Sequence, residues 1–326
     1  VAKFDRTLTN LVALAYVGGK GGDVVLDLAV DGAGNAYLTG YTDSPDYPTT
    51  NAVYPNISGS PFPGLGTYPI DAFVTKLGPQ GTNPLAVIYS TYLGGTWVDE
   101  GVGIDVDQDG AAYITGYTAS TNTFPLANTV TNELLRSLAY GGGGDGFVAK
   151  ISPSGSSLVY SMFLGGTNID AGSGIVVDPA GVAHVTGYTR STNFPAANGL
   201  AGGADVFVAH VAMATNVAYV ADSRLMGGRG DNFAYRIALD AEGNDYIVGS
   251  SAGDSGLPVT PSLLYPGGIF RSDDAAANWQ GINSGFHSIA ATALAVDPNN
   301  SAHLFAATWH GLLQSWDGGA HWDGGI

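Results

Sequence analysis

The chain is a succession of short apolar runs separated by tight polar turns. One such unit, residues 29–42, reads Ala-Val-Asp-Gly-Ala-Gly-Asn-Ala-Tyr-Leu-Thr-Gly-Tyr-Thr. Two apolar runs flanking a Gly- and Asn-containing turn are typical of antiparallel strands joined as a hairpin. The unit recurs with the same spacing between an Asp and a later Gly, at Asp31/Gly40, Asp107/Gly116, Asp178/Gly187 and Asp240/Gly249. Fixed spacing of this kind indicates a repeat architecture.

Two further signatures keep step with the first. Apolar runs end in Gly-Gly at Gly18, Gly94, Gly165 and Gly227, and Asp-x-Phe-Val segments begin at Asp71, Asp145 and Asp205. In the first complete copy, four short strands are expected at about Val24–Val30, Ala36–Thr42, Ala72–Leu77 and Ala86–Tyr92. The first of them is the most continuously apolar, which predicts burial on both faces. Repeated four-stranded units predict an all-β chain, a β-propeller of four-stranded antiparallel blades.

The sequence predicts about five to seven blades. Residues 1–16 match only the last two strands of a repeat, and about five copies follow. Because open sheet edges are normally protected, we expect either that terminal strands pair to close a ring or that the chain is part of a longer array.

Composition narrows the function classes. Glycine occurs 49 times and charged residues make up 12% of the chain, which suits short strands and tight turns. The net charge of −17 argues against a nucleic-acid partner, and it suits either cation binding or simple solubility. There is no cysteine, hence no thiol or disulfide chemistry. No apolar run is long enough to span a membrane directly, and the start at Val1 without a signal peptide suggests a processed or trimmed chain.

The repeat resembles the bacterial SBBP-type β-propeller repeat over about residues 1–251. The residues that carry this resemblance are Asp31, Gly34, Asn35, Gly40, Tyr41, Thr42, Asp71, Phe73, Lys76, Tyr92, Gly94 and Gly95. It implies propeller blades over residues 1–256, with the first blade partial. The fourth copy departs from the pattern, since Gly249 is followed by Ser-Ser.

Residues 257–326 carry a different motif, which we expect to form further blades of the same propeller. Ser-x-Asp-x-Gly-x-x-Trp resembles the Asp-box (BNR) repeat of sialidase-like and sortilin-like propellers, and a weaker copy has Ala276 in place of the Gly. For such boxes we predict a structural role, in which Asp accepts backbone N–H groups and Trp packs on the hairpin. The residues concerned are Ser272, Asp274, Trp279, Ser315, Asp317 and Trp322.

Two sets of carboxylates are candidates for binding Ca²⁺, a hard cation that prefers oxygen ligands. An acid follows each Gly-Gly, giving a predicted ring of Asp23, Asp99, Asp170 and Asp231. The alternative is that each Asp caps its own turn. The second set is Asp105, Asp107 and Asp109, which resembles the start of a Ca²⁺-binding loop but has Gly116 at the twelfth position. We favour the turn interpretation for both sets.

The six histidines provide no pair with zinc-ligand spacing. His184 stands where other copies have Tyr37 and Tyr113, and His210 stands where they have Lys. The arginines show no cluster of the kind that sialidase-type catalysis requires. We therefore predict that the chain is not an enzyme.

The most favoured function is a non-catalytic, secreted or cell-surface interaction or structural module of bacterial type. We predict that it binds a protein or glycan through the long connections at Asp43–Ile70 and Ala119–Gly144. Tyr47, Tyr54, Phe62 and Tyr68 lie in the first of these connections and would either stack on a ligand or pin the loop. The alternatives are an extracellular glycoside hydrolase or lyase of sialidase-like propeller type, and a self-assembling subunit of a surface array or filament.

Overall fold

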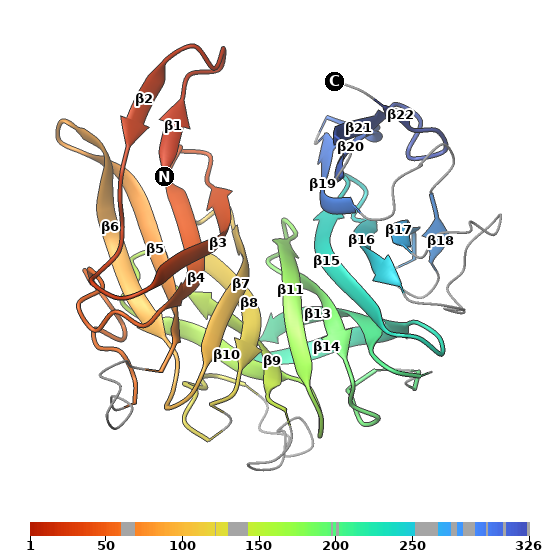
Figure 1. Ribbon diagram of the computed structural model, residues 1–326, viewed down its shortest axis with the longest axis horizontal. Coiled ribbons are helices and arrows are strands. Elements are labelled where there is room, and N and C mark those ends of the chain that lie inside the picture. The colour runs from red at the N-terminus through yellow and green to blue at the C-terminus, as the bar shows by residue number, and fades with distance from the viewer. Residues whose placement is uncertain are drawn as a thin grey trace. The chain divides into compact units, whose positions relative to one another are not determined.

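The computed structural model describes residues 1–59, 69–120, 122–129, 143–196, 198–199, 202–251, 267–274, 279–282, 291–297, 299–308 and 311–324. Every regular element within these residues is a β-strand. Among them there is no helix of the length and apolarity needed to cross a membrane. The described strands form five four-stranded antiparallel sheets and one two-stranded sheet (Figure 1). The predicted β-propeller fold with four-stranded blades is therefore confirmed.

Each blade takes its four strands in chain order. The half-blade is β1 (Ala2–Phe4) and β2 (Leu11–Leu14). Blade 1 is β3 (Asp23–Val30), β4 (Ala36–Thr42), β5 (Asp71–Gln80) and β6 (Asn83–Leu93). Blade 2 is β7 (Asp99–Val106), β8 (Ala112–Thr118), β9 (Asp145–Ile151) and β10 (Leu158–Leu164). Blade 3 is β11 (Asp170–Val177), β12 (Ala183–Thr189), β13 (Asp205–Ala214) and β14 (Val217–Met226). Blade 4 is β15 (Asn232–Leu239), β16 (Asp245–Ser251), β17 (Gly267–Ser272) and β18 (Gln280–Gly281), and blade 5 is β19 (Ala291–Asp297), β20 (Asn300–Thr308), β21 (Gly311–Ser315) and β22 (Asp323–Gly324).

The chain divides into two compact units. The first comprises Val1–Thr129 with Phe147–Phe163 and contains the half-blade, blade 1 and nearly all of blade 2. The second comprises Val130–Gly146 with Leu164–Ile326 and contains blades 3 to 5. The predicted change of repeat type between residues 256 and 257 lies outside the described residues and stays a prediction.

The repeated Asp fixes the turn between the first two strands of a blade. In blade 1, Asp31 Oδ1 accepts the backbone N–H groups of Ala33 at 3.0 Å and Asn35 at 2.9 Å. Gly34 lies between these residues with φ of +82°, a conformation that favours glycine. The same pair of backbone contacts recurs at Asp107, Asp178 and Asp240. Asp31 and Gly34, three residues apart, therefore belong to one capped hairpin turn.

The glycine of each Gly-Tyr-Thr segment is required by a close backbone approach. The first strand of blade 1 is bulged between Val25 and Asp27. A methyl group on Gly40 would overlap the carbonyl oxygen of Val24 on that strand. The equivalent overlaps occur at Gly116, Gly187 and Gly249. The bulge thus explains why a Gly recurs at a fixed distance from the turn.

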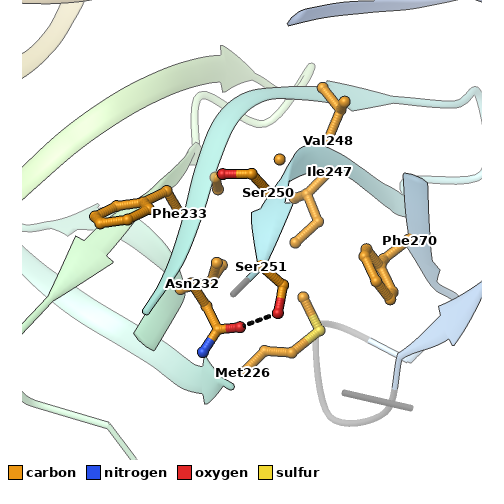
Figure 2. Close-up of a pocket in the computed structure, with 11 residues that line it drawn as sticks. Met226, Asn232, Phe233, Ile247, Val248, Ser250, Ser251 and Phe270 are labelled. Carbon is orange, nitrogen blue, oxygen red and sulfur yellow. Dashed lines mark hydrogen bonds between the residues drawn. The ribbon is translucent and has the colours of Figure 1, made fainter. Parts of the chain in front are cut away.

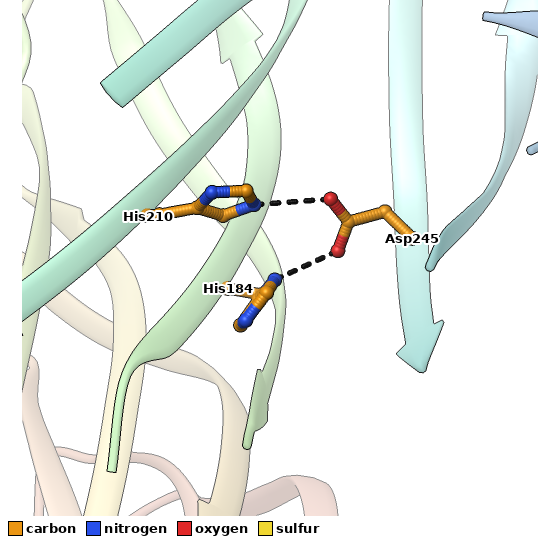
Figure 3. A group of neighbouring side chains, drawn as sticks. All are labelled: His184, His210 and Asp245. Atoms are coloured by element: carbon orange, nitrogen blue, oxygen red, sulfur yellow. Dashed lines mark hydrogen bonds and ion pairs between the residues drawn. The ribbon is translucent and has the colours of Figure 1, made fainter. Parts of the chain in front are cut away.

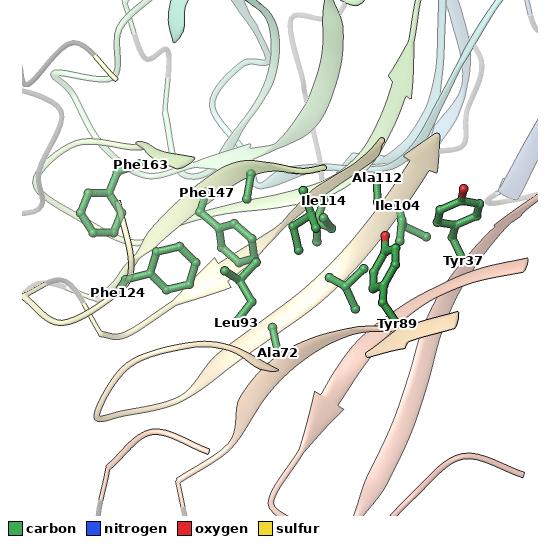
Figure 4. Close-up of a cluster of buried hydrophobic side chains, with 13 residues drawn as sticks. Tyr37, Ala72, Tyr89, Leu93, Ile104, Ala112, Ile114, Phe124, Phe147 and Phe163 are labelled. Atoms are coloured by element: carbon green, nitrogen blue, oxygen red, sulfur yellow. The ribbon is translucent and has the colours of Figure 1, made fainter. Parts of the chain in front are cut away.

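The second strand of each blade is more buried than the first. In β4 every residue except Tyr41 is buried, whereas β3 leaves Val25, Leu28 and Val30 about half exposed. The prediction that residues 24–30 are covered on both faces is therefore wrong for this copy. The first unit is held together by apolar side chains from blades 1 and 2, among them Tyr37, Ile104 and Phe147 (Figure 4).

Candidate functional site

The described residues contain one group of three His, Asp or Glu side chains whose ligand atoms lie within 4.8 Å of one another: His184, His210 and Asp245. His184 on β12 and His210 on β13 are direct cross-strand partners in blade 3. Asp245 is the first residue of β16 in blade 4. Since β15 of blade 4 packs beside β11 and β12 of blade 3 within the second unit, the group bridges two adjacent blades.

Asp245 contacts both imidazoles at once (Figure 3). Its Oδ1 lies 2.8 Å from His184 Nδ1, and its Oδ2 lies 3.0 Å from His210 Nε2. The two imidazole rings are 4.1 Å apart between centroids. All three side chains are less than one-tenth exposed to solvent. Buried polar groups of this kind are stable only when they are paired.

Two further carboxylates face the outer nitrogens of the histidines. Asp222 Oδ1 lies 3.0 Å from His210 Nδ1, and Asp178 Oδ2 lies 3.8 Å from His184 Nε2. Burial alone would lower the pKa of His210, but its interactions with Asp245 and Asp222 outweigh burial and raise that pKa. Burial alone would raise the pKa of Asp245, whereas its contacts with the two histidines lower it.

The repeat pattern contained the signal for this group, although spacing along the chain did not. At the position of His184, blades 1 and 2 have tyrosines, over which Lys76 and Lys150 place their ammonium groups. The strand register pairs Asp245 with the last residue of the first strand of its blade. In blades 1 to 3 the residue paired in the same way is an alanine, namely Ala36, Ala112 and Ala183. Three ordinary repeat positions are therefore changed together in blades 3 and 4. No pair of histidines has zinc-ligand spacing along the chain. The fold nevertheless makes His184 and His210 cross-strand partners.

The predicted ring of acids consists mainly of turn caps. Asp99 Oδ2 accepts the N–H of Gly95 at 2.6 Å and the hydroxyl of Ser120 at 2.8 Å, while its Oδ1 accepts the hydroxyl of Thr118. Matching contacts from the Gly-Gly amide and a serine hydroxyl recur at Asp23 and Asp170. These contacts are those of the turn-capping alternative.

Asp231 does not occupy the fourth position of this ring. The register pairs Asp23, Asp99 and Asp170 with the Thr of Gly-Tyr-Thr, and in blade 4 the residue paired at that point is Asn232. Asp231 is partly exposed, lies 2.8 Å from Arg190 Nη2 and accepts the N–H of Ala204. Selection by charge rather than by register misplaced the prediction by one residue.

A second acid is buried beside two of these caps, Asp99 and Asp170. A methyl group built on Gly94 would lie 2.6 Å from Asp71 Oδ1 and 2.9 Å from Asp99 Oδ2, so both carboxylates abut the same glycine. Burial raises the pKa of Asp71 to about 8, with a further contribution from Asp99, and burial raises the pKa of Asp99 to about 6. Asp145 and Asp170 abut Gly165 in the same way.

In blade 4 the equivalent pair is Asp205 with Asn232. Asn232 Nδ2 donates toward Asp205 Oδ1 at 3.5 Å, and Asn232 Oδ1 accepts the hydroxyl of Ser251 at 2.6 Å. An amide has the shape of a protonated carboxyl group and likewise offers a donor. The third copy therefore places a neutral group where the first two copies have an acid.

Asp105, Asp107 and Asp109 do not converge on one point. Asp107 caps its turn and forms a salt bridge with Lys150 at 3.0 Å. Asp105 accepts the N–H of Val106, and Asp109 is exposed. Among the described residues, neither this segment nor the predicted ring forms a cluster of three or more candidate ligands.

The C-terminal motif residues form local contacts. Ser315 donates to Asp317 at 2.9 Å and accepts the N–H of Gly319, and Asp317 accepts the N–H of His321 at 2.8 Å. The buried Trp322 donates its indole N–H to the carbonyl of Ile282 at 2.6 Å. At the other motif, Ser272 donates to Asp274 at 3.1 Å. Trp279 packs beside a buried apolar cluster, while Ala276 lies outside the described residues.

Two of the four aromatic residues of the first long connection lie among the described residues, and both contact their own blade. Tyr47 is buried, packs on Phe73 and shares a hydrogen bond with Thr75, so it pins the loop. Tyr54 is partly buried and exchanges backbone contacts with β6. Phe62 and Tyr68, like most of the second connection, lie outside the described residues.

A pocket in the second unit is mainly apolar (Figure 2). Met226, Ile247, Val248 and Phe270 line it together with a few polar groups from the Asn232 and Ser251 segments. No acid, base or histidine is among its lining residues.

The family described as Beta-propeller repeat (SBBP) matches residues 14–48 and 88–124. The first match runs from the end of the half-blade into the first two strands of blade 1, and the second runs from β6 into blade 2. These two segments thus match SBBP-type β-propeller repeats, in agreement with the resemblance seen in the sequence. A search among curated proteins finds no match.

The comparison with solved structures finds matches at low sequence identity. A xyloglucanase from Xanthomonas campestris is 15% identical with a TM-score of 0.43, and the match covers 92% of this chain but only 38% of the enzyme. A protein of unknown function from Dyadobacter fermentans is 12% identical with a TM-score of 0.45, over 93% of this chain and 80% of that protein. A Hadza microbial sialidase is 12% identical with a TM-score of 0.40, over 79% of this chain and 54% of the sialidase.

Proposed function

We propose that the chain is a non-catalytic interaction or structural module that acts outside the bacterial cell or on its surface. The observation that carries this proposal is the exposed apolar surface at the half-blade and β3. Exposed apolar patches that extend over several strands are typical of protein contact sites. We therefore propose a protein partner.

The half-blade presents both an open edge and an apolar face. β1 pairs only with β2 among the described strands. One face of this two-stranded sheet packs on blade 1 through Ala13 and the partly buried Val1, Ala15 and Val17. The other side chains are about half exposed, namely Phe4, Leu11, Val12 and Leu14. A sheet edge in this state is a template for a further strand.

β3 leaves further apolar side chains exposed. Elsewhere within each unit, the first strand of a blade packs against the first two strands of the preceding blade, as β7 does with β3 and β4. β3 has only the half-blade before it, and Val25, Leu28 and Val30 are 48%, 46% and 58% exposed. The exposed positions on β3 are thus those that a hairpin like the first two strands of a blade would cover.

We propose that this surface accepts such a β-hairpin. Its second strand would pair with the edge of β1, as β4 pairs with β5, and its first strand would cover β3, as β3 and β7 lie together in blades 1 and 2. The long connections, through which we also expected protein or glycan binding, are less informative because their described residues are mostly packed on their own blades.

Binding of a hairpin peptide tests this function. The probe is a labelled synthetic peptide of residues 170–191, the first hairpin of blade 3, which is less acidic than its counterpart in blade 2. Fluorescence anisotropy should show saturable binding to the whole chain, and a scrambled peptide should not bind. Val1 and Ala15 exchange backbone hydrogen bonds, so the amide of Ala2 faces the open edge. The Ala2→Pro variant should therefore bind the peptide at least ten-fold more weakly.

Two other functions remain as alternatives to this proposal. Turnover of any glycan in a broad panel, abolished by replacing one acid, would favour a glycoside hydrolase or lyase. Stable dimers or larger species in the absence of peptide would favour a subunit of a surface array.

The C-terminal Ser-x-Asp motifs fit either case as structural Asp-boxes, since their contacts stay within the hairpin or reach the neighbouring blade. Ca²⁺ binding by the turn-capping acids would add stability to these loops and is tested by a thermal melt in EDTA followed by Ca²⁺.

A further inference from the structure

His184, His210 and Asp245 supply the ligand types that zinc prefers. Imidazole nitrogens and carboxylate oxygens bind Zn²⁺, usually with four ligands in total. One nitrogen of each imidazole and one carboxylate oxygen of Asp245 lie within 4.8 Å of one another. The side chains are buried, so water competes poorly for the same atoms. A small movement of each side chain would exchange the present contacts for bonds to a central cation.

The outer carboxylates are placed as the second layer of a metal site. Histidines that bind metals normally direct the other ring nitrogen toward a carboxylate or carbonyl, which orients the ring and leaves the inner nitrogen free to bind. His210 has Asp222 in this position at 3.0 Å, and His184 has Asp178 at 3.8 Å. The two histidines therefore share one inner carboxylate, and each has its own outer one.

The charge of the cluster also suits a divalent cation. Three carboxylates, Asp178, Asp222 and Asp245, surround two imidazoles. With neutral imidazoles the buried Asp245 carries a negative charge that is unfavourable without compensation, and the partly exposed Asp178 and Asp222 add to it. A divalent cation between the inner ligands would neutralise most of that charge.

The other blades show how the same positions pack without such a cluster. In blade 2, Tyr113 and Lys150 stand in place of His184 and His210, with the Lys150 ammonium 4.5 Å from the Tyr113 ring centroid and 3.0 Å from Asp107. In blade 3, Ala183 occupies the position that Asp245 has in blade 4. Packing alone is thus satisfied by Tyr, Lys and Ala. The three changes in blades 3 and 4 together create a set of ligands.

We propose that His184, His210 and Asp245 bind one Zn²⁺ ion that fastens blade 3 to blade 4, with Asp178 and Asp222 orienting the imidazoles. Zn²⁺ would replace the direct His–Asp contacts by bonds from two strands of one blade and one strand of the next. The site is independent of the half-blade surface.

Zinc titration of the whole chain after EDTA treatment and dialysis tests this site. Calorimetry should give one tight site per chain, and Zn²⁺ should raise the midpoint of thermal unfolding reversibly, because the metal binds the folded state. Co²⁺ should produce visible d–d absorption that Zn²⁺ removes. The absence of both the midpoint shift and the Co²⁺ absorption in the wild-type chain would overturn the proposal.

Variants separate this site from adventitious binding. The triple change H184Y/H210K/D245A introduces the residues that the other blades have at these positions, so the chain should fold. Its affinity for Zn²⁺ should be at least 100-fold lower. Asp222→Asn should weaken binding by about 10- to 100-fold. His321→Ala removes an exposed His–Asp pair and should change nothing. An unchanged Zn²⁺ response in the folded triple variant, or its loss in His321→Ala, would contradict the assignment.

Discussion

At the residue scale, the buried acid pairs are the most unusual feature of the blades. Asp71 is fully buried, and its Oδ1 has no hydrogen-bond partner among the described residues, while its Oδ2 accepts the N–H of Ser58. Two adjacent carboxylates in such a place cannot both be ionised cheaply. The Asp205–Asn232 pair of the third copy shows the neutral solution to the same problem.

Replacing Asp71 by Asn should make the chain more stable at high pH. Folded Asp71 keeps its proton up to about pH 8, whereas the carboxyl group ordinarily loses it near 3.8. The folded state therefore binds more protons than the unfolded state between these values, and the free energy of unfolding falls as pH rises across that window. At pH 8 the D71N variant should gain about 1–3 kcal/mol, since an unpaired buried charge is removed. At pH 4 it should gain little.

Urea unfolding at both pH values measures this difference. Asp109→Asn is the matched control, because Asp109 is an exposed acid of the same compact unit. The stability of this variant should follow the wild type at both pH values. A D71N variant that is less stable than the wild type at pH 8 would show that the ionised carboxylate is stabilised in the folded chain.

At the element scale, we predict that the glycines opposite the strand bulges, such as Gly116, tolerate no side chain. A methyl group on Gly116 would overlap the carbonyl oxygen of Glu100 on the neighbouring strand, which is backbone and cannot turn away. Gly116→Ala should therefore destabilise the chain by about 2–4 kcal/mol. Gly32→Ala is the control, since a methyl group there meets nothing within 4 Å. Equal thermal midpoints for the two variants would contradict the role assigned to the bulge.

The elements could be predicted from the sequence because each repeats a local rule. The Asp-capped turn and the bulge glycine act within one hairpin, so spacing along the chain is enough to locate them. The histidine site could not be found in this way, because His184, His210 and Asp245 come from three strands of two blades. The acid ring failed at Asp231 for a related reason, since only strand register identifies Asn232 as the equivalent residue.

At the scale of the whole molecule, an apolar surface lies on a strongly acidic chain. The net charge of −17 opposes self-association through the half-blade at low salt. Salt screens this repulsion, so weak association should increase with ionic strength. The double change V25K/L28K places charges on the exposed face of β3 and should abolish the increase without lowering the thermal midpoint, because both side chains are about half exposed. Sedimentation velocity from low to high salt measures this, and association that persists in the variant would point to another surface.

Hydrogen exchange with and without the 170–191 hairpin peptide tests the proposed hairpin site, because it locates the contact. We expect slower exchange in residues 1–4 and 23–30, which form the edge of β1 and the face of β3, and little change in blades 3 to 5. Peptide binding with protection confined to other blades, or no protection at saturating peptide, would contradict the proposal that this chain acts by accepting a β-hairpin at its half-blade.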